Sequence, residues 1–141
     1  MMKPLVTFAG LAILVGAVAQ AEPCNKSTFS SKTGEAYLEA ETALMEKNDP
    51  AAALPITTAL WTSNLNCFER DSVRKLRAAV FVELKDFGNA ISLLDPIVSD
   101  ESQPREERAR TAYNIGQLYR AMGNVEAGAP YLALSEKLKA E

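Results

Sequence analysis

Residues 109–138 read ARTAYNIGQLYRAMGNVEAGAPYLALSEKL and carry the clearest structural pattern in the chain. Small and apolar side chains recur at steps of three and four residues, the spacing of one buried helix face. In the first half they are Ala109, Ala112, Ile115, Tyr119 and Met122. Gly123 and Asn124 interrupt this series, and a second one follows at once, formed by Ala127, Tyr131, Leu134 and Leu138. So short a turn leaves the two helices as an antiparallel pair, so the stretch predicts a helical hairpin.

This hairpin resembles a tetratricopeptide repeat. Its matching residues stand at that family's N-L-G-x-x-Y…G…A…F spacing and are Asn114, Ile115, Gly116, Tyr119, Gly123, Gly128 and Leu132. The resemblance implies an all-α, right-handed solenoid of about three such hairpins. It also implies a scaffold for binding and does not specify an activity.

Weaker copies of the hairpin precede it. Turn residues at 48–50 and 86–88 each separate two apolar helical series, and the small residues Ala53, Ala90 and Gly128 recur at intervals of 37 and then 38 residues. Thr33 is expected to cap the first helix, and a helix is expected to start the middle copy near residue 69. The solenoid domain is therefore predicted to span residues 35–141, after a polar lead-in at 22–34.

The N-terminus has the pattern of a signal peptide. Lys3 precedes an apolar run from Leu5 to Val18, and Ala19-Gln20-Ala21 has the small-x-small pattern of a cleavage site. The alternative is a membrane anchor, but this run of 14 residues is shorter than the roughly 20 that a spanning helix needs. Residues 1–21 are predicted to be removed, which leaves no stable membrane anchor and a periplasmic or secreted protein.

Charge and residue types exclude several classes of function. Removing residues 1–21 takes away one of the 15 basic residues and none of the 18 acidic ones, so the remaining net charge is −4. An acidic chain repels phosphate backbones, so no nucleic-acid partner is expected. The chain contains no histidine, the usual general base and the commonest metal ligand. Nor does it contain a phosphate-binding or dinucleotide-binding motif. We therefore expect a protein that is not an enzyme and has no cofactor and no metal site.

Cys24 and Cys67 are the only cysteines of the sequence. In an exported protein two cysteines favour one disulfide. The second helix of the first hairpin should run back to the level of the lead-in, which would bring Cys67 near Cys24. Free thiols and a redox-active pair are the alternatives, although no nearby residue is expected to depress a thiol pKa.

The tetratricopeptide resemblance also implies where a partner binds. In that family the first helix of each hairpin lines a concave groove. Carried over by position, the candidate partner-binding residues are Arg110, Tyr113, Asn114, Gln117 and Arg120 in the third copy and Lys75 in the second, with Ala79 and Val82 beside it. In the first copy the same positions hold Glu35, Leu38, Thr42 and Met45. A merely solvated helix face is the alternative interpretation.

The resulting prediction is a non-catalytic module that binds a protein or peptide through its concave helical face. The alternative is a self-associating, homo-oligomeric subunit of an envelope assembly. That alternative rests on an apolar stripe of the last helix, Tyr131, Leu134 and Leu138, which has no capping helix after it in the sequence.

Overall fold

A computed structural model describes residues 24–141 of the chain. The predicted signal segment, residues 1–21, lies outside the described residues. Within residues 24–141 there are six helices and no strand, which confirms the all-α class. The helices are α1 Ser31–Met45, α2 Pro50–Trp61, α3 Cys67–Glu83, α4 Phe87–Ser99, α5 Arg105–Ala121 and α6 Val125–Ala140.

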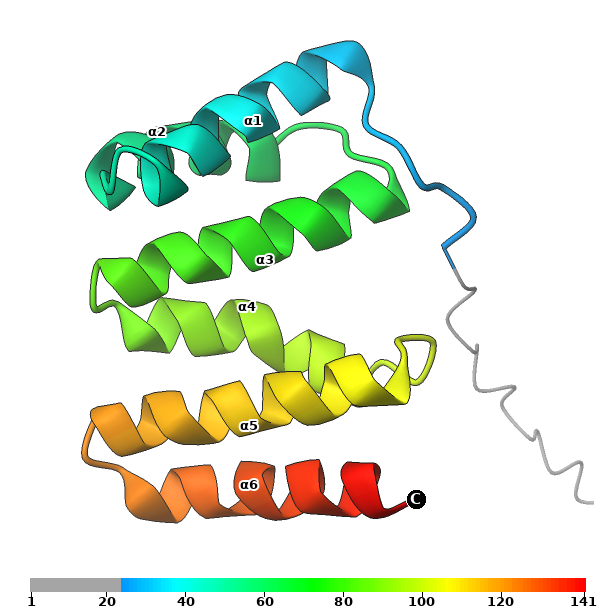
Figure 1. Ribbon diagram of the computed structural model, residues 1–141, viewed down its shortest axis with the longest axis vertical. Coiled ribbons are helices and arrows are strands. Elements are labelled where there is room, and N and C mark those ends of the chain that lie inside the picture. The colour runs from blue at the N-terminus through cyan, green and yellow to red at the C-terminus, as the bar shows by residue number, and fades with distance from the viewer. Residues whose placement is uncertain (1–23) are drawn as a thin grey trace, which may run out of the picture.

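The six helices form three hairpins that stack in chain order (Figure 1). Each helix packs against the next one in sequence, and α1 also contacts α3. The first helices of the first two hairpins, α1 and α3, therefore lie side by side, and Lys75 of α3 forms an ion pair with Glu107 of α5. The family identity of the repeats stays a prediction.

The turn inside each hairpin is built in the same way. A residue with positive φ comes first: Asn48 at 51°, Lys85 at 61° and Gly123 at 77°. The next residue, Asp49, Asp86 or Asn124, caps the second helix by accepting a hydrogen bond from the backbone three residues later. Pro50 takes the first helical position, where its missing N–H would have no partner in any case.

The small residues that set the predicted period lie in the core. Ala53 and Ala90 have no exposed surface and Gly128 is buried, so the intervals of 37 and 38 residues correspond to three equivalent positions. One cluster of buried side chains joins the first three helices and a second one joins α4, α5 and α6. At Gly128 the backbone of α6 lies so close to α5 that a Cβ atom there would stand 2.8 Å from the carbonyl oxygen of Gly116.

Two helix starts differ from the prediction. The first helix begins at Ser31 with Ser30 as its N-cap residue, so Thr33 lies inside the helix and residues 31–34 of the predicted lead-in belong to it. The third helix begins at Cys67, two residues before the expected start near residue 69, because Asn66 and Glu69 form a reciprocal capping box.

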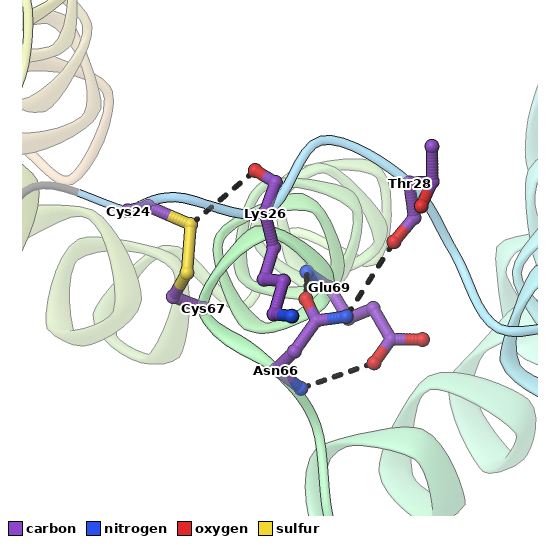
Figure 2. Close-up of a disulfide and its surroundings, with 6 residues drawn as sticks. All are labelled: Cys24, Lys26, Thr28, Asn66, Cys67 and Glu69. Atoms are coloured by element: carbon purple, nitrogen blue, oxygen red, sulfur yellow. Dashed lines mark hydrogen bonds between the residues drawn. A yellow bond between two sulfur atoms is a disulfide. The ribbon is translucent and has the colours of Figure 1, made fainter.

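The same capping box holds the lead-in segment (Figure 2). Glu69 is 4% exposed, and its Oε2 accepts hydrogen bonds from the backbone N–H and the hydroxyl of Ser30, both at 3.1 Å. Asn66 Nδ2 donates to the carbonyl of Thr28 at 3.4 Å. The N–H of Asn66 gives Glu69 its strongest stabilising hydrogen bond, and the pKa of that carboxyl is lowered although burial opposes the shift.

A disulfide between Cys24 and Cys67 joins the same two segments, as predicted, with a Cα–Cα distance of 5.6 Å (Figure 2). The bridge links residues 43 positions apart in the sequence. A structural disulfide suggests an oxidising, extracellular environment. Together with Glu69, it ties the lead-in to the start of the second hairpin.

Candidate partner-binding surface

A cleft of about 420 Å³ lies between α3 and α5. Lys75, Ala79 and Val82 come from α3, and Arg110, Asn114 and Gln117 come from α5. The half-buried side chains of Leu94 in α4 and Leu118 in α5 also line it. Four of the six predicted partner-binding residues, Lys75, Arg110, Asn114 and Gln117, are therefore brought to one cleft.

The other two predicted residues do not line this cleft. Tyr113 is 45% exposed and lines a separate cleft of about 570 Å³ that α5 forms with the end of α6. There Nζ of Lys139 lies 5.4 Å from the centroid of its ring. Arg120 is exposed and lines neither cleft. Because neighbours on a helix point about 100° apart, Tyr113 faces away from the side chain of Asn114.

The cations of the α3–α5 cleft are already paired with acids. Lys75 Nζ lies 2.9 Å from a carboxylate oxygen of Asp71 and 3.2 Å from one of Glu107, and Glu107 also accepts a hydrogen bond from Arg110. Burial alone would raise the pKa of Glu107, but the contacts with Arg110 and Lys75 outweigh it and lower that pKa. Glu107 therefore stays ionised, and together with Asp71 it balances the charges of Lys75 and Arg110.

Two amide side chains remain for a partner in this cleft. Asn114 is exposed and Gln117 is half-buried. Within residues 24–141, the side-chain hydrogen bonds that α5 donates come from Arg108 and Arg110. Asn114 and Gln117 thus present donors and acceptors beside an apolar lining.

The first helix of the first hairpin carries two exposed apolar side chains. Leu38 is 60% exposed and Met45 is 73% exposed on α1, at two of the positions that the family resemblance assigned to the groove. α1 contacts α3, which forms one wall of the polar cleft. Leu38 and Met45 therefore lie on the helix next to that wall.

Glu107 is the residue of this surface that the sequence did not indicate, because an acid at this position reads as solvated surface. Its side chain is 19% exposed and sits between cations of two different helices. The pairing with Arg110, three residues later on the same helix, is visible in the sequence. The pairing with Lys75 of the preceding hairpin is not, since it depends on how α3 and α5 lie together.

The prediction that the apolar stripe of the last helix is left uncovered is wrong. Leu138 is 6% exposed, and Tyr131 and Leu134 pack against the cluster that contains Ile115. Tyr131 also donates a hydrogen bond to Asp95 of α4 at 2.6 Å. These three residues do form one apolar helix face, but that face packs against α4 and α5. The outward face of α6 carries exposed residues such as Ala129, Ala133, Glu136 and Lys137.

In the part of the chain that the structure describes, no group of three or more acidic or cysteine side chains is placed to hold a metal ion. No helix between residues 24 and 141 has both the length and the apolar character for a bilayer crossing. The chain matches no protein-family model, no curated protein and no solved structure.

Proposed function

We propose that this protein is a non-catalytic binding module that takes an extended peptide segment of a partner protein in the α3–α5 cleft. The observation that carries the proposal is the combination of unpaired amides and apolar side chains in one cleft of about 420 Å³. Clefts of this size and mixed lining are typical of binding sites. The tetratricopeptide resemblance, with its right-handed solenoid, supports the same face.

The amides suit the backbone of an extended peptide. Each offers a carbonyl oxygen and an NH₂ group, so Asn114 and Gln117 can pair with the N–H and C=O of a strand-like segment. Ala79, Val82 and Leu118 would bury small aliphatic side chains of that segment. Because Asp71 and Glu107 together neutralise Lys75 and Arg110, the cleft favours an uncharged segment over an acidic one.

The proposed location is the periplasm or the secreted space, after cleavage at residue 21. The disulfide supports an oxidising compartment. The apolar run followed by Ala19-Gln20-Ala21 supports export. N-terminal sequencing of the exported protein should find Glu22 as the first residue, and a retained N-terminal segment would contradict this location.

Selection from a random peptide library tests the proposed cleft and needs no candidate partner. We expect the selected peptides to be uncharged and to compete for one site. Asn114→Ala should weaken them by about 1 kcal/mol, roughly fivefold, if one hydrogen bond is lost. Lys137→Ala, an exposed position on α6, is the matched control and should leave the affinity unchanged.

Two charge variants sharpen this test. Glu107→Gln removes the carboxylate shared by Lys75 and Arg110, so it should strengthen the binding of acidic peptides, most clearly at low salt. Arg110→Glu places a second carboxylate beside Glu107 and should weaken the same peptides. Equal affinities for wild type, Asn114→Ala and both charge variants would reject the cleft as the site.

A self-associating subunit of an assembly is the second candidate. The exposed Leu38 and Met45 on α1 favour it, in place of the stripe of α6 that packs inward. Light scattering over a range of concentrations separates the two, because a self-associating protein grows in mass. Leu38→Ser together with Met45→Ser should abolish that growth, whereas Ala133→Ser on the outer face of α6 should not.

A further inference from the structure

A third cleft, of about 430 Å³, lies beside the disulfide and away from the proposed peptide site. The start of α3, the end of α4 and the connector to α5 form it. Phe68, Ile97 and Pro104 give it apolar walls, and Ile97 is 3% exposed. Its charged lining residues are Lys26, Arg70, Arg74, Asp71 and Asp100.

Two arginines of this cleft are held by one tryptophan. Arg70 and Arg74 stand four residues apart, on the same face of α3. Their guanidinium carbons lie 5.0 and 5.1 Å from the centroid of the Trp61 ring. Stacking on an aromatic ring fixes a guanidinium while its N–H edge stays available for hydrogen bonds. Trp61 therefore preorganises both arginines.

Neither arginine has an acidic partner among the described residues. Arg74 donates to the carbonyl of Leu93 at 3.2 Å, and Arg70 makes a long contact of 3.5 Å with the carbonyl of Ser63. The ion pairs within residues 24–141 do not include either guanidinium. The positive charge of both side chains is thus left without a directly bound carboxylate.

The two acids of the cleft are engaged elsewhere. Asp71 pairs with Lys75 at 2.9 Å. Asp100 accepts hydrogen bonds from the backbone N–H and the hydroxyl of Ser102, at 3.0 and 2.6 Å. Neither carboxylate is bonded directly to Arg70 or Arg74, although both attract Arg74 through space. Three cations against two acids leave the cleft with a net positive charge beside apolar walls.

We propose that this cleft binds a small organic acid, in which a carboxylate or phosphate group is attached to an apolar body. The oxyanion would accept hydrogen bonds from Arg70 and Arg74, because a guanidinium presents a fork of N–H donors that matches both groups. The apolar body would lie against Phe68 and Ile97. This site is independent of the peptide cleft, so either proposal can fail without the other.

Calorimetry with two probes tests the site and separates the two oxyanions. Benzoate and phenyl phosphate carry the same ring with different anionic groups, and the tighter one identifies the preferred group. Inorganic phosphate lacks the apolar body and benzyl alcohol lacks the charge, so both should bind at least tenfold more weakly than the better aromatic acid.

Three arginine variants locate the binding. Arg70→Ala should weaken the better probe at least tenfold, the scale expected when hydrogen bonds to a charged group are lost. Arg70→Lys keeps the charge but loses the fork, so it should cause a smaller loss. Arg77→Ala is the matched control, because Arg77 lies over the ring of Phe81 and donates to Thr58 at 2.8 Å outside this cleft.

The folded state of each variant is checked by circular dichroism melting. Loss of probe binding in Arg70→Ala and retention in Arg77→Ala, with both proteins folded, would support the site. No binding of either aromatic acid by the wild-type protein at low salt would overturn the proposal. An equal loss in Arg77→Ala would overturn it as well, because the effect would then be general. Should Arg70→Ala fail to fold, the graded loss in Arg70→Lys decides.

Discussion

Replacing Gly128 by alanine tests the close approach of α5 and α6. A Cβ atom at this position would stand 2.8 Å from the carbonyl oxygen of Gly116 and 3.1 Å from the Cβ atom of Tyr119. Both are atoms fixed by the backbone of α5, so neither can rotate away. The two helices would have to separate, and overpacking of this kind typically destabilises by about 1–3 kcal/mol.

A second effect of the substitution has the opposite sign. Alanine is favoured over glycine in a helix by about 1 kcal/mol, so the net loss for Gly128→Ala should lie between about zero and 2 kcal/mol. Gly88→Ala provides the control, because Gly88 also lies within a helix and a Cβ atom there has no neighbour within 4 Å. That variant should gain up to about 1 kcal/mol.

The informative quantity is the difference between the two variants, which isolates the steric effect. Urea unfolding followed by circular dichroism should place Gly128→Ala about 1–3 kcal/mol below Gly88→Ala in free energy of unfolding. For a domain of about 120 residues this corresponds to roughly 4–12 °C in Tm. Equal stability of the two variants would show that α5 and α6 do not meet at Gly128.

Three further substitutions test the contacts between hairpins. Cys67→Ser opens a loop of 43 residues and should lower the free energy of unfolding by about 4 kcal/mol in the chain-entropy model; urea titration under non-reducing conditions measures it, and an unchanged midpoint would refute the stabilising role. Glu69→Gln should lower the free energy of unfolding by about 2 kcal/mol at pH 7, because the charge that accepts hydrogen bonds from Ser30 and Asn66 is removed. The folded pKa of Glu69 is below its ordinary value of 4.5, so its contribution is complete above that pH and is lost as the pH falls through the folded pKa. The Tm values of wild type and variant should therefore converge as the pH falls from 6 to 3. A constant difference in Tm over this range would contradict the stabilising role of the Glu69 carboxylate. Tyr131→Phe should lower the free energy of unfolding by about 1 kcal/mol at neutral pH. The hydrogen bond to Asp95 raises the pKa of Tyr131 from 10.0 to about 12, so the stability difference between wild type and variant should disappear as the pH rises from 10 to 12. A difference that persists above pH 12 would contradict the role of this hydrogen bond.

The sequence predicts the hairpin architecture because its turns depend on local chemistry. Asp49 and Asn124 cap helices through their own backbone neighbours, and Gly123 has the positive φ that glycine adopts most readily. These interactions span three residues or fewer, so residue types in order are sufficient to find them. The periodic burial of Ala53 and Ala90 follows from the same local pattern.

The wrong start of α3 concerns a local contact, the capping box of Asn66 and Glu69, whereas the other errors concern contacts between residues that are distant in sequence. Ser30, the N-cap residue of α1, bonds to Glu69 in α3, and no local pattern indicates that partner. The stripe of Tyr131, Leu134 and Leu138 shows that α6 has an apolar face, but the sequence does not show that the preceding helices already cover it.

In the candidate site, too, the local pattern was predictable and the contacts between distant residues were not. Arg110, Asn114 and Gln117 line one cleft because residues three or four apart share a helix face. Lys75 joins them from α3 through the packing of the hairpins. Tyr113 falls on a neighbouring face and pairs with Lys139 of α6. Glu107 gains its importance from Lys75 in the preceding hairpin.

Nuclear magnetic resonance titration of the isotope-labelled protein with a selected peptide tests the proposed function most directly. We predict that the backbone amide signals of Lys75, Ala79, Asn114 and Gln117 shift together and saturate at one affinity, while those of Ala129, Ala133 and Lys137 on the outer face of α6 stay in place. Shifts confined to α6, or to the exposed Leu38 and Met45 without the α3–α5 cleft, would contradict the proposal that this cleft binds the partner.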